Sequence, residues 1–286
     1  MDYLDFYSLK DHPFALSADD RFYFNSAQHT RVLTKMKYTI DERRGLGVLV
    51  GDLGTGKTTL ARRLLEEMDE SAYEATLLAI THPAATAQWV LGKIAAQIGI
   101  ETPADSRNAV LEQIYNRLVE IDEAGKKTVV LIDETQMLRQ KEIMIELRGL
   151  LDMEPDGHKL ITFILCGTEE IDEGLATYKP LQQQVSARCR ISAFPPSTTA
   201  EYVRHRMGVG GTKKAVFADN TYDIIHRFSG GIPRVINIIC DNAMLEGCLL
   251  KKVTIDKALL EEVVADLNLQ DTTKDTAKES AAEPAA

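Results

Sequence analysis

The segment with the clearest chemical signature is Gly51-Asp-Leu-Gly-Thr-Gly-Lys-Thr58, which matches the pattern GxxxxGK[ST] in full. Its three glycines let the backbone curl until several N–H groups point at one polyphosphate, and the helix that follows directs its positive end at the same anion. The apolar run Gly47–Val50 lies directly before the segment, as the strand before a phosphate-binding loop should. We therefore expect nucleotide phosphates to bind these loop residues: Gly51, Gly54, Thr55, Gly56, Lys57, Thr58 and Thr59.

A second group of reactive side chains, Asp133 and Glu134, follows the apolar run Thr128–Ile132. Nucleotide hydrolysis needs oxygen ligands that hold a hydrated Mg²⁺ and a base that polarises the attacking water. Thr58 and Asp133 are the predicted Mg²⁺ ligands. Glu134 is the predicted base, and Lys57 is the cation that reaches the β- and γ-phosphates. Together they predict an enzyme that hydrolyses a nucleoside triphosphate with Mg²⁺ as its metal ion.

The elements that must hold these groups alternate between short apolar runs and amphipathic segments. Strands are predicted at 47–50, 75–81, 128–132 and 160–165, with a weaker edge strand at 190–194, and helices at 26–42, 58–68, 86–98 and 106–123. Continuous apolar runs are typical of parallel strands buried on both faces, and their alternation with helices indicates βαβ units. The predicted fold is α/β, a parallel P-loop sheet sandwiched by helices. The long stretch between Lys57 and Asp133 favours one further strand between the loop strand and the acidic strand.

The pattern changes after Pro195-Pro196, where strand-like runs stop. Helices are predicted at 198–208, 220–228, 233–248 and 254–267. The sequence Thr198-Thr-Ala-Glu201 predicts a capping box at the start of the first of these helices. The predicted domains are an α/β nucleotide-binding core at 1–196 that includes an N-terminal linker segment at 1–45, a small helical lid at 197–269, and a disordered polar tail at 270–286.

Composition limits the class of protein. The chain has 286 residues, of which 44% are hydrophobic and 27% charged, and its 33 Lys+Arg against 43 Asp+Glu give a net charge of −10. This charge disfavours a protein that coats nucleic acid, because phosphate neutralisation needs a surplus of Lys and Arg. The N-terminus lacks the features of a signal peptide, and Pro83 interrupts the uncharged stretch 75–92, so we expect no membrane insertion. A cytoplasmic protein is expected, with its four scattered cysteines reduced and in the core.

With these motifs in place, the chain resembles an AAA+ ATPase. The resemblance implies that the nucleotide is ATP, that it is hydrolysed to ADP and phosphate, and that ATP and Mg²⁺ are the cofactors. Such enzymes place a polar sensor after the strand predicted at 160–165, which implies that Thr168 reaches the γ-phosphate and the attacking water; alternatively, Thr168 and Glu169 cap a helix. The resemblance also implies an arginine finger that stabilises transition-state charge in the neighbouring subunit. Arg188 is the candidate and Arg190 the alternate, unless Arg188 is a plain surface arginine.

The resemblance implies one more nucleotide contact, in the stretch Ser229-Gly-Gly-Ile-Pro-Arg234. It is similar to the second sensor of AAA+ proteins, in which an arginine at the start of a lid helix contacts nucleotide within its own subunit. Pro233 fits the first turn of such a helix. Arg234 is therefore the predicted residue. For the adenine base, Phe22 to Phe24 could provide contacts or could form an ordinary hydrophobic seam.

Several longer stretches resemble one group in that family, the ATPases of the ExeA/GspA (general secretion pathway protein A) type. These stretches are 3–14, 20–24, 51–59, 133–136, 146–148 and 229–243. Thr135 departs from the alanine that the group usually has. Members often continue into a membrane helix and a peptidoglycan-binding domain, whereas this chain ends in a short polar tail. We therefore expect a form without either part, which acts through a protein partner in an envelope secretion, pilus or polysaccharide-export system.

For the leading function the resemblance implies a homo-oligomer, because an Arg188 finger works only between subunits.

The resemblance leaves two other functions to weigh. A DNA-associated ATP switch of the type that helps transposition or replication shares the same core, and its contacts would come from Arg43-Arg44, Arg62-Arg63 and Lys213-Lys214. The third function, a scaffold that binds ATP without turnover, is disfavoured by Glu134.

Overall fold

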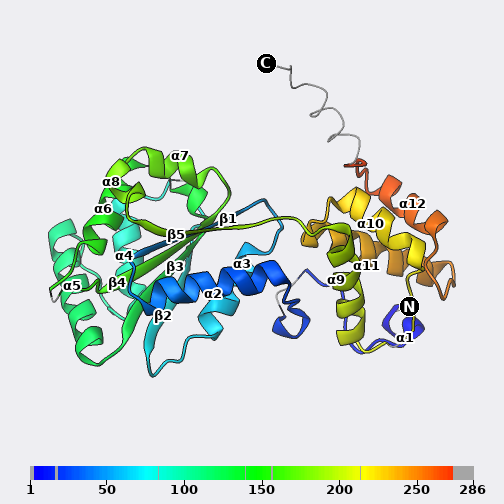
Figure 1. Ribbon diagram of the computed structural model, residues 1–286, viewed down its shortest axis with the longest axis horizontal. Helices are drawn as coiled ribbons and strands as arrows, with labels where there is room; N and C mark the ends of the chain where they lie inside the picture. The colour runs from blue at the N-terminus through cyan, green and yellow to red at the C-terminus, as the bar shows by residue number, and fades with distance from the viewer. Residues whose placement is uncertain are drawn as a thin grey trace, which may run out of the picture. The chain divides into compact units, whose positions relative to one another are not determined.

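The computed structural model describes residues 3–16, 19–82, 84–138, 140–155, 157–212 and 214–272. They form two compact units. The first is Ala27–Ile191, and the second joins the N-terminal segment up to Ser26 to the chain from Ser192 onward. Each unit has a hydrophobic cluster of its own. In Figure 1 the dark blue N-terminal segment accordingly lies among the yellow to red helices of the second unit.

The first unit contains a five-stranded parallel sheet in the order β2-β3-β4-β1-β5. Its strands are β1 (Leu46–Gly51), β2 (Tyr73–Ala79), β3 (Lys127–Asp133), β4 (Ile161–Gly167) and β5 (Val185–Ile191). Because the strands are parallel, β1, β3 and β4 end at the same edge of the sheet, where ligands of such folds bind. One strand does separate the loop strand from the acidic strand. That strand is β4, whereas the extra strand that follows the loop in sequence, β2, lies at the edge.

Helices cover both faces of this sheet (Figure 1). On one face lie α2 (Ala27–Asp41) and α3 (Lys57–Glu66); on the other lie α4 (Ala87–Gln97), α5 (Arg107–Glu123) and α6 (Lys141–Leu151). The short helices α7 (Ile171–Ala176) and α8 (Lys179–Gln182) pack beside α6, and the 3-10 turn η2 (Thr135–Met137) follows β3. The three layers confirm the predicted α/β fold. The larger core lies between the sheet and α4, α5 and α6.

The prediction for the last strand was wrong in its position. β5 runs from Val185 to Ile191, whereas the apolar pattern placed it at 190–194. As the edge strand of the sheet it is buried on one face, so buried Cys189 and Ile191 alternate with the exposed arginines Arg188 and Arg190. A search for continuous apolar runs does not detect a strand of this kind, because only strands buried on both faces are apolar throughout.

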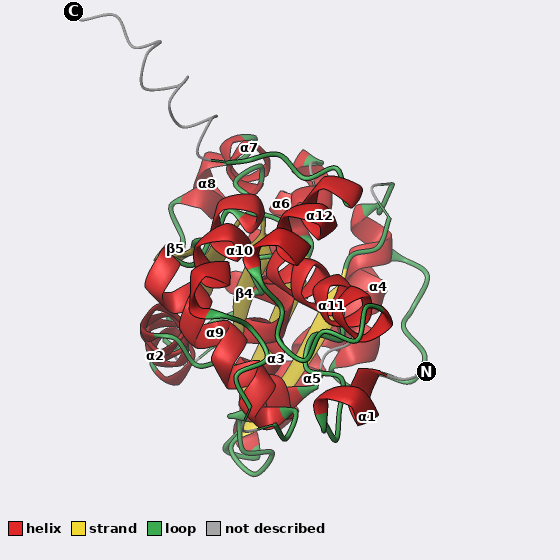
Figure 2. Cartoon of the chain, turned by 90° about the vertical axis from the view of Figure 1, so that its right-hand side faces the viewer, coloured by secondary structure: helices red, strands yellow, loops and turns green. Residues whose placement is uncertain are grey.

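The second unit is helical apart from one isolated bridge between Phe217 and Ile255, within the ranges described (Figure 2). Its elements are α1 (Tyr3–Tyr7), η1 (Asp20–Phe22), α9 (Pro196–Val209), η3 (Asp219–Thr221), α10 (Tyr222–Ser229), α11 (Pro233–Leu249) and α12 (Lys257–Asp266). The predicted capping box is not formed. α9 begins at Pro196, two residues before Thr198, and proline suits this first helical position because its missing N–H would have no helical partner there.

The N-terminal segment packs differently from the predicted division of the chain. Residues 1–45 were expected with the α/β core, yet the part up to Ser26 belongs to the helical unit. Tyr3, Tyr7 and Phe14 are buried in that unit's core, and the Tyr7 hydroxyl donates to the Lys252 carbonyl at 3.0 Å. These aromatic side chains belong to one hydrophobic cluster with residues of α9, α10, α11 and α12. The predicted lid thus includes a segment from the far end of the sequence.

The start of the tail is also bound to the helical unit. The Asp271 carboxylate accepts a hydrogen bond from the Arg227 guanidinium, and the Thr272 hydroxyl donates to the Arg227 carbonyl at 2.6 Å. The tail predicted to begin at residue 270 therefore contains ordered residues up to Thr272. Its remainder, 273–286, lies outside the described residues.

Two further features bear on the sequence-based expectations. In the ranges described, we find no helix that is both long and apolar enough to cross a membrane. All four cysteines are free and buried, which confirms their assignment to the core. Cys166 and Cys189 belong to β4 and β5 of the first unit, and Cys240 and Cys248 to α11 of the second.

Candidate nucleotide-binding site

The loop between β1 and α3 has the backbone conformation that its glycines predict. A Cβ atom on Gly51 would lie 2.6 Å from the Ile191 carbonyl oxygen, so no larger residue fits at the end of β1. Gly56 precedes α3 with φ at +99°, in the left-handed region that favours glycine. Thr55 is buried, and its hydroxyl donates to the Asp52 carbonyl at 2.7 Å, which holds the loop closed on itself.

The N-terminus of α3 is prepared for an anion. No side chain among the described residues caps the helix, and its first turn contains no acidic residue. The N–H groups of the first turn have no partner within a helix, and they carry the positive end of the helix dipole. Thr58 and Thr59 are both exposed in this turn. The turn can therefore donate hydrogen bonds to phosphate oxygens.

Lys57 directs its ammonium group back along the loop. It is 6% exposed, and its Nζ donates to the Gly51 and Asp52 carbonyls at 2.8 and 2.9 Å. Burial lowers the pKa of Lys57, and the nearby carboxylates of Glu134 and Asp133 oppose that shift. A buried ammonium that bonds to neutral carbonyls gains a stronger partner when an anion binds the loop.

The predicted Mg²⁺ ligands are in direct contact. The Thr58 hydroxyl donates to Asp133 Oδ2 at 2.6 Å, although the two residues are far apart in sequence. Asp133 is buried at the end of β3, and its Oδ1 accepts the Glu134 N–H at 3.0 Å. A hydroxyl and a carboxylate are the hard oxygen donors that Mg²⁺ prefers, usually with several water ligands. The residues present therefore fit this ion.

Glu134 leaves the strand in an unusual conformation. Its φ of 57° and ψ of 36° lie in the left-handed region, which is uncommon for a residue with a side chain. The chain then enters η2, and this turn brings the Gln136 amide back to donate to the Glu134 carboxylate. The Gln136 side-chain oxygen Oε1 accepts the backbone N–H of Thr168 at 3.2 Å. Sequence reasoning missed this link, although the spacing Asp-Glu-x-Gln contains it.

Thr168 directly follows β4, and its hydroxyl is buried without a hydrogen-bond partner among the described residues. Such an orphaned group is costly unless a ligand satisfies it. The alternative in which Thr168 and Glu169 cap a helix is wrong, because Glu170 precedes α7 and no side chain caps that helix within the described residues. The role of Thr168 as a sensor stays a prediction.

Arg188, which precedes the strand predicted at 190–194, and Arg190 both lie within β5. The Arg188 guanidinium forms two hydrogen bonds with the Asp172 carboxylate, at 2.6 and 2.5 Å, and Arg190 pairs with Glu169. Both arginines are exposed at the edge strand. They are therefore accessible to a partner, but each is also neutralised by an acidic residue near α7.

Arg234 is the second residue of α11 and is exposed. It belongs to the helical unit, whereas the phosphate loop, Asp133, Glu134 and Thr168 belong to the first unit. The structure therefore brings together four elements of the predicted site, and the contact of Arg234 with nucleotide stays a prediction.

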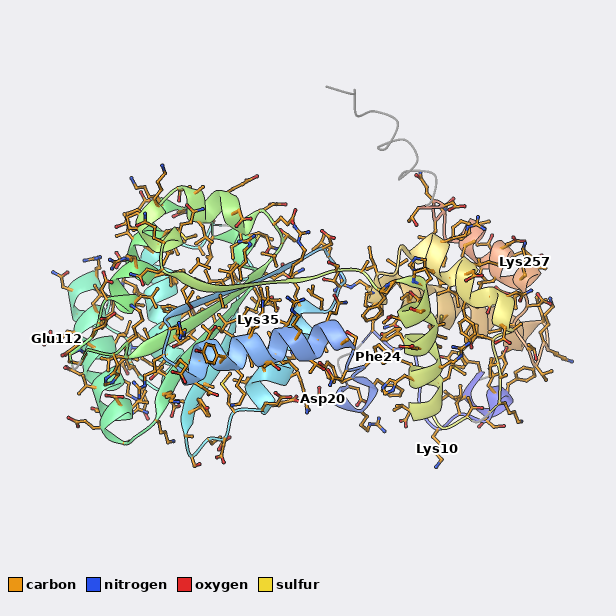
Figure 3. All side chains as sticks on the ribbon, in the orientation of Figure 1. Lys10, Asp20, Phe24, Lys35, Glu112 and Lys257 are labelled. Atoms are coloured by element: carbon orange, nitrogen blue, oxygen red, sulfur yellow. The ribbon has the colours of Figure 1, made fainter. Side chains whose placement is uncertain are left out.

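The aromatic residues considered for adenine form a hydrophobic seam in the helical unit. Phe24, which is labelled in Figure 3, packs against Phe194 and Tyr202; its ring centroid lies 5.8 and 5.7 Å from theirs. Phe22 is buried beneath the guanidinium of Arg206, whose carbon lies 5.0 Å from the ring centroid. Both rings are therefore part of that unit's packing.

Part of the basic surface considered for DNA is committed to the protein itself. Arg43 is only 20% exposed and pairs with Asp122 at 2.6 Å. Arg63 pairs with Glu66 and Glu67 of its own helix. Lys213 lies outside the described residues. The proposed DNA stripe thus loses one member of each of the first two pairs.

The sheet order, the phosphate loop on β1, the acidic pair on β3 and the polar residue after β4 define a P-loop nucleotide-binding protein of the AAA+ class. Residues 40–175 match the family model described as "AAA domain". The chain is also 32% identical over 246 residues to general secretion pathway protein A of Aeromonas hydrophila. It belongs to the AAA+ family, as a member of the ExeA/GspA type. The match covers 85% of this chain and 44% of that relative, so the chain spans less than half of the relative's length.

Solved structures with the same fold come from more distant proteins. Cdc6p of Pyrobaculum aerophilum superposes with a TM-score of 0.70 at 17% identity, covering 86% of this chain and 68% of that one. The ORC2 protein of Aeropyrum pernix, solved as ADPNP–ADP complexes, gives a TM-score of 0.65 at 15% identity, with 87% and 72% covered. At such identities these likenesses support the fold alone.

Proposed function

We propose that the protein is a Mg²⁺-dependent ATP hydrolase that works as an oligomer in assembling an envelope secretion, pilus or polysaccharide-export machine. The hydrolase assignment rests on one observation. The Thr58 hydroxyl contacts the Asp133 carboxylate beside Glu134, at the edge of the sheet where the phosphate loop lies. A simple phosphate-binding protein needs the loop but has no use for a metal ligand pair next to a carboxylate base.

Each residue has a defined part in this reaction. The first turn of α3 and Lys57 bind the β- and γ-phosphates, and Thr58 and Asp133 hold Mg²⁺, which neutralises the charge that develops on the phosphate oxygens. The Glu134 carboxylate accepts a hydrogen bond from the attacking water and polarises it. The Thr168 hydroxyl donates to the γ-phosphate or to that water, which would satisfy its orphaned oxygen.

The catalytic assignment is tested by two variants at the site. Lys57→Ala should abolish binding of a fluorescent ATP analogue. Glu134→Gln should keep that binding within a few-fold while phosphate release falls by about 10²-fold or more, the scale of a lost general base. If both variants hydrolyse ATP like the wild type, the active-site assignment is wrong.

The oligomeric assignment rests on Arg188, which is exposed on β5 and therefore available to a neighbouring subunit. Arg188→Ala should bind ATP but hydrolyse it slowly, and so should Glu134→Gln. In a mixture, some interfaces combine an intact Glu134 with an intact Arg188, so activity should partly return. The matched variant Arg190→Ala should stay active by itself. A mixture no more active than its components would contradict a finger in trans.

The secretion assignment is supported by the resemblance to general secretion pathway protein A, which covers most of this chain. The net charge of −10 and the internal pairing of Arg43 and Arg63 count against the DNA-associated switch. A DNA titration of the ATP-bound protein at two salt concentrations separates the two functions. Tight binding that weakens steeply with salt would favour the switch, and weak binding at both concentrations would favour the envelope role.

A further inference from the structure

Gln136 contacts both the predicted base and the predicted sensor segment. Its amide nitrogen donates to the Glu134 carboxylate, and its amide oxygen accepts the Thr168 N–H at 3.2 Å. The side chain is 8% exposed, so water competes little for either hydrogen bond. One planar amide therefore joins the end of β3 to the end of β4 across the site.

The neighbouring backbone holds this amide in place. A Cβ atom on Gly167 would lie 2.7 Å from the Gln136 amide oxygen and 2.8 Å from the Thr135 hydroxyl, so the glycine leaves the space that both side chains occupy. Thr135 in turn donates to the Cys166 carbonyl at 2.8 Å. Two successive side chains of η2 are thus bonded to the chain at the end of β4, Thr135 to the Cys166 carbonyl and Gln136 to the Thr168 N–H.

This arrangement has a consequence for Glu134. Its backbone is in the left-handed region, and its carboxylate accepts a hydrogen bond from the Gln136 amide. A base must be held within a fraction of an ångström of its working position, because a displacement of about 1 Å can reduce a rate by about 10²-fold. The Gln136 amide supplies a fixed donor for one carboxylate oxygen and leaves the other oxygen for water.

We propose that Gln136 is a positioning residue that aims the Glu134 carboxylate according to the position of the Thr168 segment. This inference rests on the proposed hydrolase function, in which Thr168 lies at the γ-phosphate. Because the same amide bonds to both groups, a shift of the Thr168 backbone moves the donor that holds Glu134. The presence of a γ-phosphate would thereby be communicated to the base through a single side chain.

The first test replaces the amide by a group of similar size without hydrogen bonds. In Gln136→Met, kcat for ATP should fall by about 10- to 100-fold, while the Kd for a fluorescent ATP analogue stays within about threefold. Gln140→Met is the matched control, because Gln140 is exposed and caps no backbone group with its side chain. Wild-type kcat in Gln136→Met, or an equal loss in the control, would overturn the proposal.

The second test asks whether Gln136 acts through Glu134. When Gln136→Met is added to Glu134→Gln, the remaining activity should not fall further, because the group that it positions is already gone. In Gln136→Glu, two carboxylates in contact retain a proton more strongly. The acidic limb of the kcat–pH profile should therefore move to higher pH than in the wild type. A further tenfold loss in the double variant, or an unshifted limb, would show a structural role only.

A third measurement does not depend on activity. Thermal unfolding of Glu134→Ala, Gln136→Met and the double variant should give non-additive shifts in Tm, because the two residues share one contact. Additive shifts in Tm would overturn the contact between Gln136 and Glu134, whether or not the protein is active. If the wild type fails to hydrolyse ATP, the proposed function itself is wrong. If the wild type is active and Glu134→Gln is not, a normal Gln136→Met overturns the positioning role alone.

Discussion

At the scale of single residues, Lys57 carries a charge in a buried position at the phosphate loop. Its pKa is lowered by desolvation, so the charged form costs free energy in the folded protein. Its value for binding therefore comes with a cost to the stability of the unliganded chain. Replacing Lys57 should therefore weaken nucleotide binding without lowering the stability of the unliganded protein.

We predict that Lys57→Met abolishes ATP-analogue binding yet leaves the unliganded protein at least as stable as the wild type at pH 7. Because the folded pKa lies below the unfolded value of 10.5, the wild type is penalised at low pH. That penalty is relieved as pH rises through the folded pKa and is gone above 10.5. Urea unfolding should show that the wild type gains stability relative to the variant between pH 7 and pH 10. A wild type that loses stability relative to the variant over this range would contradict the prediction.

Thr168 should likewise favour ATP hydrolysis while lowering the stability of the unliganded protein. Thr168→Val keeps the side-chain shape and removes a buried hydroxyl that has no partner among the described residues. The unliganded protein should become more stable by up to about 1 kcal/mol, because an unsatisfied polar group is removed. ATP hydrolysis should fall by about tenfold or more while analogue binding persists. Differential scanning calorimetry and phosphate release measure the two effects, and a loss of stability would show that the hydroxyl has a partner within the protein.

At the scale of elements, the turn between α2 and β1 is held by a half-buried ion pair. Arg43 has φ at 47° and pairs with Asp122 near the end of α5. His158 also bonds to Asp122, at 3.0 Å. Burial raises the pKa of Asp122, but the hydrogen bonds from Arg43 and His158 outweigh it and lower the pKa overall. One carboxylate thus joins three parts of the first unit.

We expect Asp122→Asn to lose about 1–3 kcal/mol of stability at pH 7, since it leaves a half-buried guanidinium without its charged partner. The contribution of a carboxylate with a lowered pKa is present above the unfolded value of 3.8 and is lost as pH falls through the folded pKa. The gap between wild type and variant should therefore close below pH 4. Glu120→Gln, a neighbouring exposed site, is the control; denaturant midpoints that differ equally at pH 3 and pH 7 would argue against the pair.

The elements differ in how far the sequence predicted them. Strands β1, β3 and β4 are continuous apolar runs, and the predictions reached their centres because burial on both faces leaves a local signal. The edge strand β5 and the short helices α7 and α8 carry no such signal, since contacts distant in sequence stabilise them. The phosphate loop was predictable because its chemistry needs a fixed spacing. The Gln136 bridge was not, because it depends on the left-handed turn at Glu134.

At the scale of the whole molecule, the chain is divided between two units that do not follow the sequence order. The buried guanidinium of Arg206 donates to the Pro13 and Ala15 carbonyls, which fastens the N-terminal segment to α9. The sequence placed residues 1–45 with the α/β core and gave no sign of this contact. A sequence pattern does not show in which of two hydrophobic cores a segment packs. The N-terminal segment packs in the core of the C-terminal helices, which is the farther of the two along the chain.

Removal of residues 1–16 should therefore destabilise the helical unit and spare the sheet. Hydrogen exchange should accelerate for α9 and α11, which lose buried contacts with Tyr3, Tyr7 and Phe14, and should change little for β1, β3 and β4. Removal of residues 273–286 is the control and should leave both patterns unchanged. Faster exchange in the sheet than in the helices would contradict the division of the chain.

The even distribution of the cysteines, two buried in each unit, has a practical consequence. Burial raises the pKa of the Cys166 and Cys240 thiols, which suppresses the reactive thiolate until the surrounding structure opens. The alkylation rate of Cys166 therefore reports how often the sheet opens beside Asp133, and the alkylation rate of Cys240 reports how often α11 opens. The chain thereby carries its own chemical reporters, and the motions of its two halves can be followed separately without attaching a label or changing an amino acid.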